Sequence, residues 1–505
     1  MRVDQLIDIR NNGGKIAVIG IGQENSQFLE WLEVVVQFPK SQIILADRYS
    51  TNNLKKAEYA QVFEGENYLD CLQNNHVELV FKAPGIWSLL PELEDFRKRK
   101  GLNRVMSSLV FFVERFREQI IGVTGTKGKS TVSSLTNHLL NELGKDRIKS
   151  YYCGNTTNIS PYQHWTKLDQ SVESKTFFVI ELSSFQLQDL GYAKISPKYS
   201  IITNYYTDHQ DQHASIEEYW AAKNNIFLYQ NVGDVFVTTQ ELINKINAQS
   251  FDQKLIQLSD EDIQQKIADF DFVLPGEHNQ TNLALSLSMI NEILETPLNN
   301  VQNSLNSYSP LPYRNQLIRT EIVVIRVNKL EKNLKINWVN DGAASEPDAV
   351  AAAVRTFGED DYLWVQFTGK NKGGEYEKVI EAILAIQTRG NLFRVDYCGD
   401  VGGLLLKKLY DNLGIEQNIA TSDFVEIVKE ELGDADAVKK QFEKWINSKI
   451  DDLESIGDTN ALEQIMDTDE SVLNIVLSPC GTSFDIFSNY IERAEFWNEN
   501  IKKAK

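Results

Sequence analysis

The sequence has few residues of the kinds that build metal clusters or disulfide frameworks. Its 505 residues include 6 histidines, 4 methionines and 4 cysteines, and no CxxC pair occurs among Cys71, Cys153, Cys398 and Cys480. Cysteines spread so widely favour free thiols in a reducing compartment over a zinc ribbon. The sequence also lacks an apolar run of membrane-spanning length and a secretory hydrophobic core at its N-terminus. We therefore expect a cytoplasmic protein that does not bind membranes.

Positive charge is scarce as well. The 71 acidic residues outnumber the 51 basic residues, which gives a formal net charge of -20 at pH 7. Nonspecific binding to nucleic acid or to an anionic membrane needs a basic face, so we expect neither partner. An acidic protein can still bind a nucleotide through local devices such as a phosphate loop, a helix N-terminus or a metal ion.

The length and the order of strand-like and helix-like segments predict the architecture. A chain of this length suggests about three domains. Apolar strand patterns begin near residues 15, 120 and 335, and each runs into a glycine-rich or polar turn. Strands that alternate with helices are typical of α/β domains with parallel sheets.

We therefore predict an α/β protein of three domains. They are a Rossmann-like domain at 1–115, a central domain of the P-loop ATPase type at 116–310 and a second Rossmann-like domain at 311–505. The stretch 415–469 is acidic, helical in pattern and free of motifs, and we predict that it is a solvated elaboration of the third domain.

The most specific motif joins a predicted strand to a predicted helix. Residues 125–131 follow the apolar strand 120–124. Glycines in such a turn let backbone N–H groups converge on phosphate oxygens, and the helix N-terminus adds partial positive charge. Lys129 would reach the β- and γ-phosphates, and Ser130 would bind Mg²⁺. The predicted ATP-binding loop consists of Gly125, Thr126, Lys127, Gly128, Lys129, Ser130 and Thr131.

This loop resembles that of the Mur ligases and their folylpolyglutamate synthase relatives, which make amide bonds through acyl phosphates. The stretch 181–187, Glu-Leu-Ser-Ser-Phe-Gln-Leu, is similar to the branch that adds D-glutamate to UDP-N-acetylmuramoyl-L-alanine. The resemblance spans nearly the whole chain. It implies an ADP-forming ligase of peptidoglycan precursor synthesis that uses those two substrates, ATP and two Mg²⁺ ions. We also expect a monomer.

The resemblance gives metal and activation roles to residues that follow two further strands. It implies that Glu181 binds Mg²⁺ and that Gln186 lines the substrate pocket. His209 corresponds to a ligand of the second Mg²⁺, although chemistry alone would favour a zinc or structural histidine. Lys223 corresponds to a lysine carbamylated by CO₂, a reaction that only the neutral amine undergoes. The residues alone would predict that Lys223 is a surface lysine.

Four other residues correspond to nucleotide contacts of the family. Asn279 and Asn282 match residues near the adenine, where an amide suits the donor and acceptor edge, although both could instead cap a helix. Arg314 matches an arginine near the transferred phosphoryl group, and Asp341 matches a ribose-binding acid.

The pocket for the incoming amino acid is implied by three positions. Lys372, Ser483 and Tyr490 correspond to residues that contact the glutamate. The loop 342–346 departs from the family, because Gly-Ala-Ala-Ser-Glu stands where hydroxyls or a lysine are usual.

The first domain carries an incomplete dinucleotide-type turn, Gly20-x-Gly22, which lacks a third glycine and is weak evidence by itself. The resemblance implies instead a site for the uridine diphosphate and muramoyl groups. The positions it assigns to that site are Gly20, Gly22, Asp47, Arg48, Pro84, Gly85 and Asn155.

Three alternatives stay open. A folylpolyglutamate-type or another muramoyl-adding ligase would keep the chemistry and change the substrate, and the stretch 181–187 argues against it. An inactive nucleotide-binding descendant is supported only by the loop 342–346. A nicotinamide dehydrogenase is suggested only by the turn at Gly20, because the other motifs serve phosphoryl chemistry.

Overall fold

The computed structural model describes most of the chain. The described residues are 3–49, 55–74, 76–154, 159–168, 175–205, 215–246, 252–274, 276–294, 300–345, 347–358, 361–371, 376–413, 423–432, 434–456, 458, 465–466, 468, 470–483, 486–487 and 489–503. The chain divides into two compact units, and each is described by itself. Unit 1 comprises Met1–Val273 and Glu277–Ser309, and unit 2 comprises Leu274–Gly276 and Pro310–Lys505.

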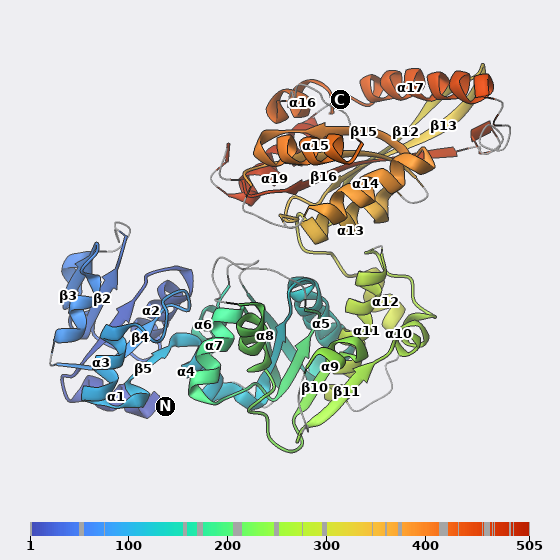
Figure 1. Cartoon of the computed structure of the whole chain (residues 1–505). Helices are drawn as coiled ribbons and strands as arrows, with labels where there is room; N and C mark the ends of the chain where they lie inside the picture. The colour runs from blue at the N-terminus through green and yellow to red at the C-terminus, as the bar shows by residue number, and fades with distance from the viewer. Residues whose placement is uncertain are drawn as a thin grey trace. The chain divides into compact units, whose positions relative to one another are not determined.

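Unit 1 begins with a sheet of five parallel strands in the order β3-β2-β1-β4-β5 (Figure 1). The order reverses between β1 and β4, and sheets of this kind bind ligands at such a switch point. The strands are β1 (Lys15–Ile19), β2 (Ile43–Asp47), β3 (Gln61–Glu64), β4 (Val77–Lys82) and β5 (Val105–Ser107), and the helices are α1 (Val3–Asn11), α2 (Gln23–Val34), α3 (Pro91–Lys100) and α4 (Ser108–Phe116).

The second sheet of unit 1 has six parallel strands in the order β11-β10-β9-β6-β8-β7. Its central strand β6 is completely buried, as expected of an apolar run inside a parallel sheet. The strands are β6 (Ile120–Thr124), β7 (Lys149–Cys153), β8 (Thr176–Glu181), β9 (Tyr199–Ile202), β10 (Val235–Thr239) and β11 (Lys254–Leu258). The helices are α5 (Lys129–Gly144), α6 (Pro161–Lys167), α7 (Ser184–Ala193), α8 (Ile216–Asn224), α9 (Gln240–Lys245), α10 (Asp260–Ile267), α11 (Glu277–Leu294) and α12 (Val301–Asn306).

The two sheets of unit 1 share one hydrophobic core. Trp31 on α2 lies with its ring centroid 4.3 Å from that of Trp165 on α6, and Phe112 on α4 lies 5.0 Å from Phe178 on β8. These residues belong to a single buried cluster. Aromatic pairs add about 0.5–1.5 kcal/mol each to the free energy gained from burying their area, so the boundary between the sheets is strongly packed.

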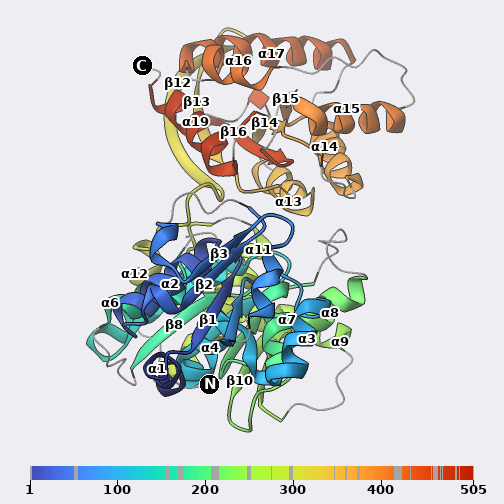
Figure 2. The ribbon, with the colours of Figure 1, turned by 90° about the vertical axis from the view of Figure 1, so that its left-hand side faces the viewer.

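Unit 2 contains a mixed sheet in the order β12-β13-β16-β14-β15 (Figure 2). The pair β12–β13 is antiparallel and the other pairs are parallel. Asn328 and Lys329 both have positive φ, 45° and 71°, as a tight hairpin turn requires. The strands are β12 (Gln316–Val327), β13 (Leu330–Asn340), β14 (Tyr362–Thr368), β15 (Leu392–Tyr397) and β16 (Glu470–Cys480).

Helices cover both faces of this sheet. The core of one face includes α13 (Pro347–Gly358), α14 (Glu377–Arg389) and α15 (Gly399–Leu413). The core of the other includes α16 (Phe424–Glu430), α17 (Ala435–Ile456) and α19 (Tyr490–Lys503). The predicted α/β class with parallel sheets is therefore confirmed, with an added antiparallel edge strand. The predicted domain boundaries remain predictions.

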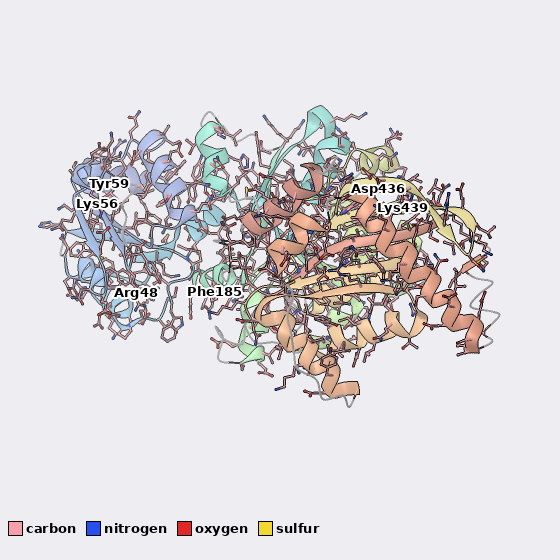
Figure 3. The ribbon with its side chains drawn as sticks, turned by 90° about the horizontal axis from the view of Figure 1, so that it is seen from above. Arg48, Lys56, Tyr59, Phe185, Asp436 and Lys439 are labelled. Atoms are coloured by element: carbon pink, nitrogen blue, oxygen red, sulfur yellow. The ribbon has the colours of Figure 1, made fainter. Side chains whose placement is uncertain are left out.

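Helix α17 corrects the prediction that 415–469 is only a solvated elaboration. Its residues Ala435, Val438, Phe442, Ile446 and Ile450 are buried at helical spacing, in the same core as β12, β13 and α19. Asp436 and Lys439, labelled in Figure 3, lie between these buried positions along the helix, and Asp436 is exposed. The helix therefore supplies part of the core of unit 2.

Within the described residues, no helix is both long enough and apolar enough to span a membrane.

Lys332 on β13 is a buried lysine with a structural role. Its Nζ donates to the carbonyl oxygens of Ile465, Met466 and Thr468 at 2.8, 2.6 and 2.8 Å. We expect Lys332→Met to destabilise unit 2 by about 2–4 kcal/mol, because three carbonyls lose a charged donor. Denaturant unfolding measures the change. The half-buried Lys335 on the same strand supplies the control Lys335→Met, and an equal loss for both variants would contradict this role.

Candidate functional site

The turn between β6 and α5 can be formed only with glycine at two positions. Gly125 and Gly128 have φ values of +149° and +79°. A Cβ on Gly125 would lie 1.9 Å from Thr203 Oγ1, and one on Gly128 would lie 2.6 Å from Asn282 Oδ1. Both the φ values and the close neighbours exclude a side chain. Gly128 is also the N-cap of α5, so the first N–H groups of that helix are directed toward the turn.

The residues that follow β9 hold this turn in place. Asn204 accepts a hydrogen bond from Lys127 N through Oδ1 at 2.8 Å, and its carbonyl oxygen accepts one from Thr126 N at 3.1 Å. Thr203 Oγ1 donates to the carbonyl of Lys127 at 2.5 Å. The turn is therefore shaped by hydrogen bonds before any ligand is considered, as a phosphate-binding loop requires.

Two lysines bring positive charge to the turn. The Nζ of Lys129 donates to the carbonyls of Gly125 and Thr126, both at 2.9 Å. The Nζ of Lys223, from α8, donates to the same Gly125 carbonyl at 2.9 Å and lies 4.5 Å from the ring centroid of Tyr219. Lys223 is 2% exposed, so it is not the surface lysine that the residue pattern alone suggested.

An acidic residue lies at the end of the neighbouring strand β8. Glu181 is buried, and its Oε2 accepts hydrogen bonds from Ser130 Oγ at 2.9 Å and from Tyr152 OH at 3.2 Å. A Cβ on Gly154 would lie 2.8 Å from Glu181 Cβ, so the carboxylate is packed against β7. The structure therefore brings together the predicted Mg²⁺ ligands Ser130 and Glu181.

These oxygen donors fit Mg²⁺ better than zinc. Mg²⁺ is usually held by one or two carboxylates together with phosphate oxygens and water, whereas structural zinc needs several histidine or cysteine ligands. No group of three or more His, Cys, Asp or Glu side chains suited to a metal occurs in the described part of the chain. His209 lies outside the described residues, as do Asn155 and Lys372.

The predicted adenine contacts lie on the first turns of α11. Asn282 Nδ2 donates to Asn279 Oδ1 at 3.2 Å, and Asn279 Nδ2 lies 3.0 Å from His278 Nε2. Burial lowers the pKa of His278, which favours the neutral ring that can accept this hydrogen bond. Because Asn282 also lies against Gly128, these amides adjoin the phosphate loop as predicted nucleotide contacts should.

In unit 2, the predicted ribose-binding residue Asp341 follows β13. Its two carboxylate oxygens accept hydrogen bonds from Asn315 N at 3.2 Å and from Ser478 Oγ at 3.3 Å. Burial raises the pKa of Asp341 to about 7, and the Asn315 hydrogen bond and the Arg314 charge oppose the rise. The structure therefore places Arg314 near Asp341.

Arg493 is a residue that the sequence analysis missed. It lies on α19, is 1% exposed, and donates from Nη1 to the Gly481 carbonyl at 3.2 Å and from Nη2 to the Gly342 carbonyl at 3.3 Å. A Cβ on Gly369 would lie 2.9 Å from its Nη1. One guanidinium thus lies among the loops after β13, β14 and β16. Ser483 is buried two residues after Gly481, and Tyr490 begins α19.

The loops of the first sheet are also brought together. Asp47 Oδ2 accepts a hydrogen bond from Ile21 N at 2.5 Å, which ties the end of β2 to the turn after β1. A Cβ on Gly20 would lie 2.7 Å from Ala83 Cβ, so this turn touches the loop that contains Pro84 and Gly85. Gly22 is the N-cap of α2, and the exposed Arg48 follows β2 (Figure 3).

Comparison with known proteins agrees with this geometry. Residues 123–290 match the family model of the Mur ligase middle domain. The chain contains a Mur ligase middle domain. This domain holds the phosphate loop, Glu181, Lys223 and the α11 amides in one segment.

Two curated relatives extend the likeness beyond the Mur ligase middle domain, and both are named UDP-N-acetylmuramoylalanine–D-glutamate ligase. The protein of Christiangramia forsetii is 28% identical over 452 residues, which cover 84% of this chain and 85% of the relative. The protein of Staphylococcus aureus is 29% identical over 338 residues, which cover 63% of this chain and 68% of the relative.

A solved structure has a similar fold. It is UDP-N-acetylmuramoylalanyl-D-glutamyl-2,6-diaminopimelate–D-alanyl-D-alanyl ligase from Acinetobacter baumannii. The TM-score is 0.52 at 10% identity, over 99% of this chain and 98% of that one. At this identity the likeness concerns the fold alone.

The raised pKa of Asp341 predicts a pH dependence of stability. Its ordinary value is 3.8 and its folded value is about 7, so between these values the folded state holds a proton that the unfolded state has released. The contribution of Asp341 to the free energy of unfolding therefore falls as pH rises from about 4 to about 7. We expect Asp341→Asn to gain up to about 4 kcal/mol relative to the wild type between pH 4 and pH 8.

Unfolding of both proteins at several pH values measures this difference. Asp400→Asn, at an exposed position in the first turn of α15, is the control and should follow the wild type at every pH. A constant offset between Asp341→Asn and the wild type would contradict the prediction.

Proposed function

We propose that this protein is an ATP-dependent, ADP-forming ligase that joins D-glutamate to UDP-N-acetylmuramoyl-L-alanine in peptidoglycan precursor synthesis. The observation that carries the proposal is the convergence, inside a Mur ligase middle domain, of the phosphate loop with Glu181 and Lys223. The names of the two relatives that match much of the chain support the choice of substrates.

The phosphate loop would bind the triphosphate of ATP. The N–H groups at the start of α5 and the Lys129 ammonium would contact phosphate oxygens, and Asn279 and Asn282 would contact the base. Ser130 and Glu181, with His209, would hold Mg²⁺, which would neutralise phosphate charge and orient the γ-phosphate. We propose two ions, as in the resemblance drawn from the sequence.

The amide would then form in two nucleophilic displacement steps. A carboxylate oxygen of the alanine residue attacks the γ-phosphorus, the bond from phosphorus to the β–γ bridging oxygen breaks, and ADP leaves. The amine of D-glutamate then attacks the acyl carbon, loses a proton, and displaces inorganic phosphate. Positioning and electrostatic stabilisation would supply most of the rate enhancement.

The remaining predicted residues would bind the other substrate parts. Lys372, Ser483 and Tyr490 would contact D-glutamate, Asp341 the ribose of ATP and Arg314 the transferred phosphoryl group. The loops at the switch point of the first sheet would bind the nucleotide-linked substrate, through Gly20, Gly22, Asp47, Arg48, Pro84 and Gly85, with Asn155 and Gln186. The predicted domain at 1–115 would bind the nucleotide-linked substrate, the domain at 116–310 would bind ATP and Mg²⁺, and the domain at 311–505 would bind the amino acid.

The use of ATP and of a nucleotide-linked substrate places such an enzyme in the cytoplasm, where ATP is made. We propose that it acts as a monomer, since each predicted task is assigned to a part of one chain. Light scattering of the purified protein measures the mass directly.

Phosphate release tests the function. Purified protein is mixed with ATP, Mg²⁺ and UDP-N-acetylmuramoyl-L-alanine, and D-glutamate, L-glutamate, L-lysine or diaminopimelate is added in turn. We expect release with D-glutamate alone. Phosphate release with another amino acid would favour a different muramoyl-adding ligase. No phosphate release with any of the amino acids would favour an inactive nucleotide-binding descendant.

Removing the Glu181 charge should weaken the metal site. We expect Glu181→Gln to lower kcat at least about 10²-fold, because a positioned charge next to the phosphate loop is lost. The variant should need more Mg²⁺ for half-maximal rate, which a Mg²⁺ titration of the phosphate-release assay measures. Glu118→Gln, at a surface ion pair with Lys198, is the control and should keep the wild-type rate. An unchanged Mg²⁺ requirement in Glu181→Gln would refute the assignment.

Lys223 is proposed to be carbamylated in the active enzyme. Its burial beside the Gly125 carbonyl would place the added carboxylate-like group at the phosphate loop. We expect Lys223→Ala to lower kcat at least about 10²-fold. Ligation at the wild-type rate would show that the lysine is dispensable.

A spectroscopic test is independent of rate. Protein prepared with ¹³C-labelled bicarbonate should show a carbamate carbonyl resonance that is missing from Lys223→Ala. Lys198→Ala, which alters a half-buried lysine away from the phosphate loop, should retain both the resonance and the activity.

A further inference from the structure

A second group of buried charged and polar side chains lies in unit 1, apart from the phosphate loop. This interdomain cluster consists of Glu24, Lys82, Ser88, Gln186 and Asp189. Lys82 ends β4 of the first sheet and Asp189 lies on α7 of the second, and their side chains are 1% and 5% exposed. Lys82 Nζ donates to Asp189 Oδ2 at 2.7 Å. The pair therefore joins the two sheets by a fully buried ionic contact.

Asp189 holds both ends of one loop. Lys82 stands immediately before the loop 83–90, and Ser88, near its end, donates from Oγ to Asp189 Oδ1 at 2.7 Å. Arg97 on α3 donates to the carbonyl of Ser88 at 2.5 Å. The loop that contains Pro84 and Gly85 is thus fixed to the carboxylate of Asp189 on α7, a helix that packs with the second sheet.

Gln186, one turn before Asp189 on the same face of α7, contacts the start of α2, which follows the other loop. Its Nε2 donates to Glu24 Oε2 at 3.0 Å, and Ser108 Oγ donates to Glu24 Oε1 at 2.9 Å. Glu24 lies in the first turn of α2, directly after the turn at Gly20 and Gly22. Helix α7 therefore contacts the loop after β4 and the first turn of α2, which directly follows the loop after β1.

The same helix begins next to the metal site. Glu181 ends β8, and Ser183 is the N-cap of α7 in a capping box with Gln186. The Gln186 Oε1 accepts from Ser183 N at 2.9 Å while its Nε2 contacts Glu24. One side chain thus links the residues after Glu181 to the first sheet.

We propose that α7 is a positioning element, in which Gln186 and Asp189 fix the two loops of the first sheet relative to Glu181 and the phosphate loop. The inference rests on the proposed function, because it takes these loops to bind the nucleotide-linked substrate. Its consequence is that the interdomain cluster sets the distance between the substrate carboxylate and the γ-phosphate. Glu24, Lys82, Ser88 and Asp189 act through the loops and do not touch the reacting atoms, whereas Gln186 also keeps its proposed place in the substrate pocket.

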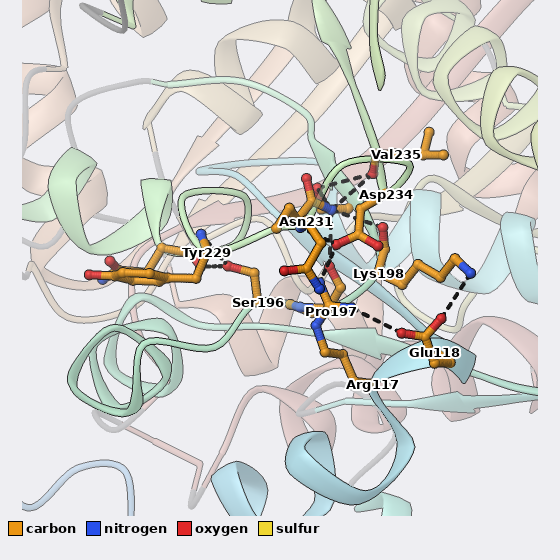
Figure 4. A network of polar contacts seen from close by, with 12 residues as sticks. Arg117, Glu118, Ser196, Pro197, Lys198, Tyr229, Asn231, Asp234 and Val235 are labelled. Atoms are coloured by element: carbon orange, nitrogen blue, oxygen red, sulfur yellow. Dashed lines mark hydrogen bonds and ion pairs between the residues drawn. The ribbon is translucent and has the colours of Figure 1, made fainter. Parts of the chain in front are cut away.

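A matched control exists at the opposite edge of the second sheet. Arg117, which follows α4, forms an ion pair with Asp234, which precedes β10, and their side chains are 15% and 5% exposed (Figure 4). Asp234 Oδ2 also accepts from Asn231 N at 2.5 Å. Asp234→Asn therefore removes a buried carboxylate charge of the same kind, at the amino ends of the strands, far along β6 from the phosphate loop.

The experiment compares Asp189→Asn with Asp234→Asn in the full chain. Asp189→Asn should raise KM for UDP-N-acetylmuramoyl-L-alanine at least about tenfold, because misplacing a bound group by even about 1 Å is costly. Its affinity for ATP analogue, measured by titration, should change by less than about twofold, since the phosphate loop is untouched. Hydrogen exchange should become faster in 20–24 and 83–90. Asp234→Asn should lower Tm and leave KM and exchange in these loops unchanged.

Two outcomes would overturn the proposal. One is that both variants lower Tm while KM and loop exchange stay at wild-type values. The other comes from the double variant Lys82→Met/Asp189→Leu, which removes both charges and should fold even if Asp189→Asn does not. We expect the double variant to regain the Tm of the wild type but to keep the raised KM of Asp189→Asn, because Ser88 still lacks its hydrogen-bond acceptor. If both Tm and KM returned to their wild-type values, the cluster would have a purely stabilising role.

Failure of the proposed function is distinguishable from failure of this inference. If the wild type releases no phosphate with any amino acid, the function is wrong. Hydrogen exchange in the two loops and titration of the ATP analogue still report whether α7 positions them.

Discussion

The site depends on how closely β9 and α11 approach the turn between β6 and α5. Thr203 and Asn282 occupy the space into which side chains at Gly125 and Gly128 would extend, and Asn204 binds the turn through its backbone and its amide. The N–H groups of the turn are therefore oriented by two separate elements, the segment after β9 and helix α11. A loop built in this way loses little conformational entropy when it binds a phosphate, because its ordering has already occurred during folding.

Electrostatics reinforce that geometry in a protein whose overall charge is strongly negative. Lys129 and Lys223 both donate to the Gly125 carbonyl oxygen, so two lysines are held beside the turn. The carboxylate of Glu181 lies at the neighbouring strand end, and the proposed carbamylation of Lys223 would add a second anionic group there. The balance fits a site that exchanges polyphosphate and metal ions during turnover.

The local part of this arrangement could be predicted from the sequence, and the long-range part could not. A glycine-rich turn between a strand and a helix is a local pattern, so residues 125–131 were identified from their order alone. Glu181 was identified through the resemblance of the stretch 181–187 to the family, and its place at the end of a parallel strand agrees with where α/β sheets bind ligands. The pairs Lys82–Asp189 and Glu24–Gln186 join residues more than 100 positions apart, and no local pattern marks them. Arg493 was missed for the same reason, since its partners lie in loops after distant strands. The core face of α17 was different: Val438, Phe442, Ile446 and Ile450 recur at helical spacing, and this local pattern was overlooked in an acidic stretch.

The aromatic core shared by the two sheets of unit 1 limits how such proteins can be recombined. Trp31, Trp165, Phe112 and Phe178 come from both sides of the boundary between the sheets and fill one another's space. A foreign sheet grafted in place of the first sheet of unit 1 would have to match that interlocking surface residue by residue. New substrate specificity in this protein is therefore reached more easily by changing loops than by exchanging the whole sheet.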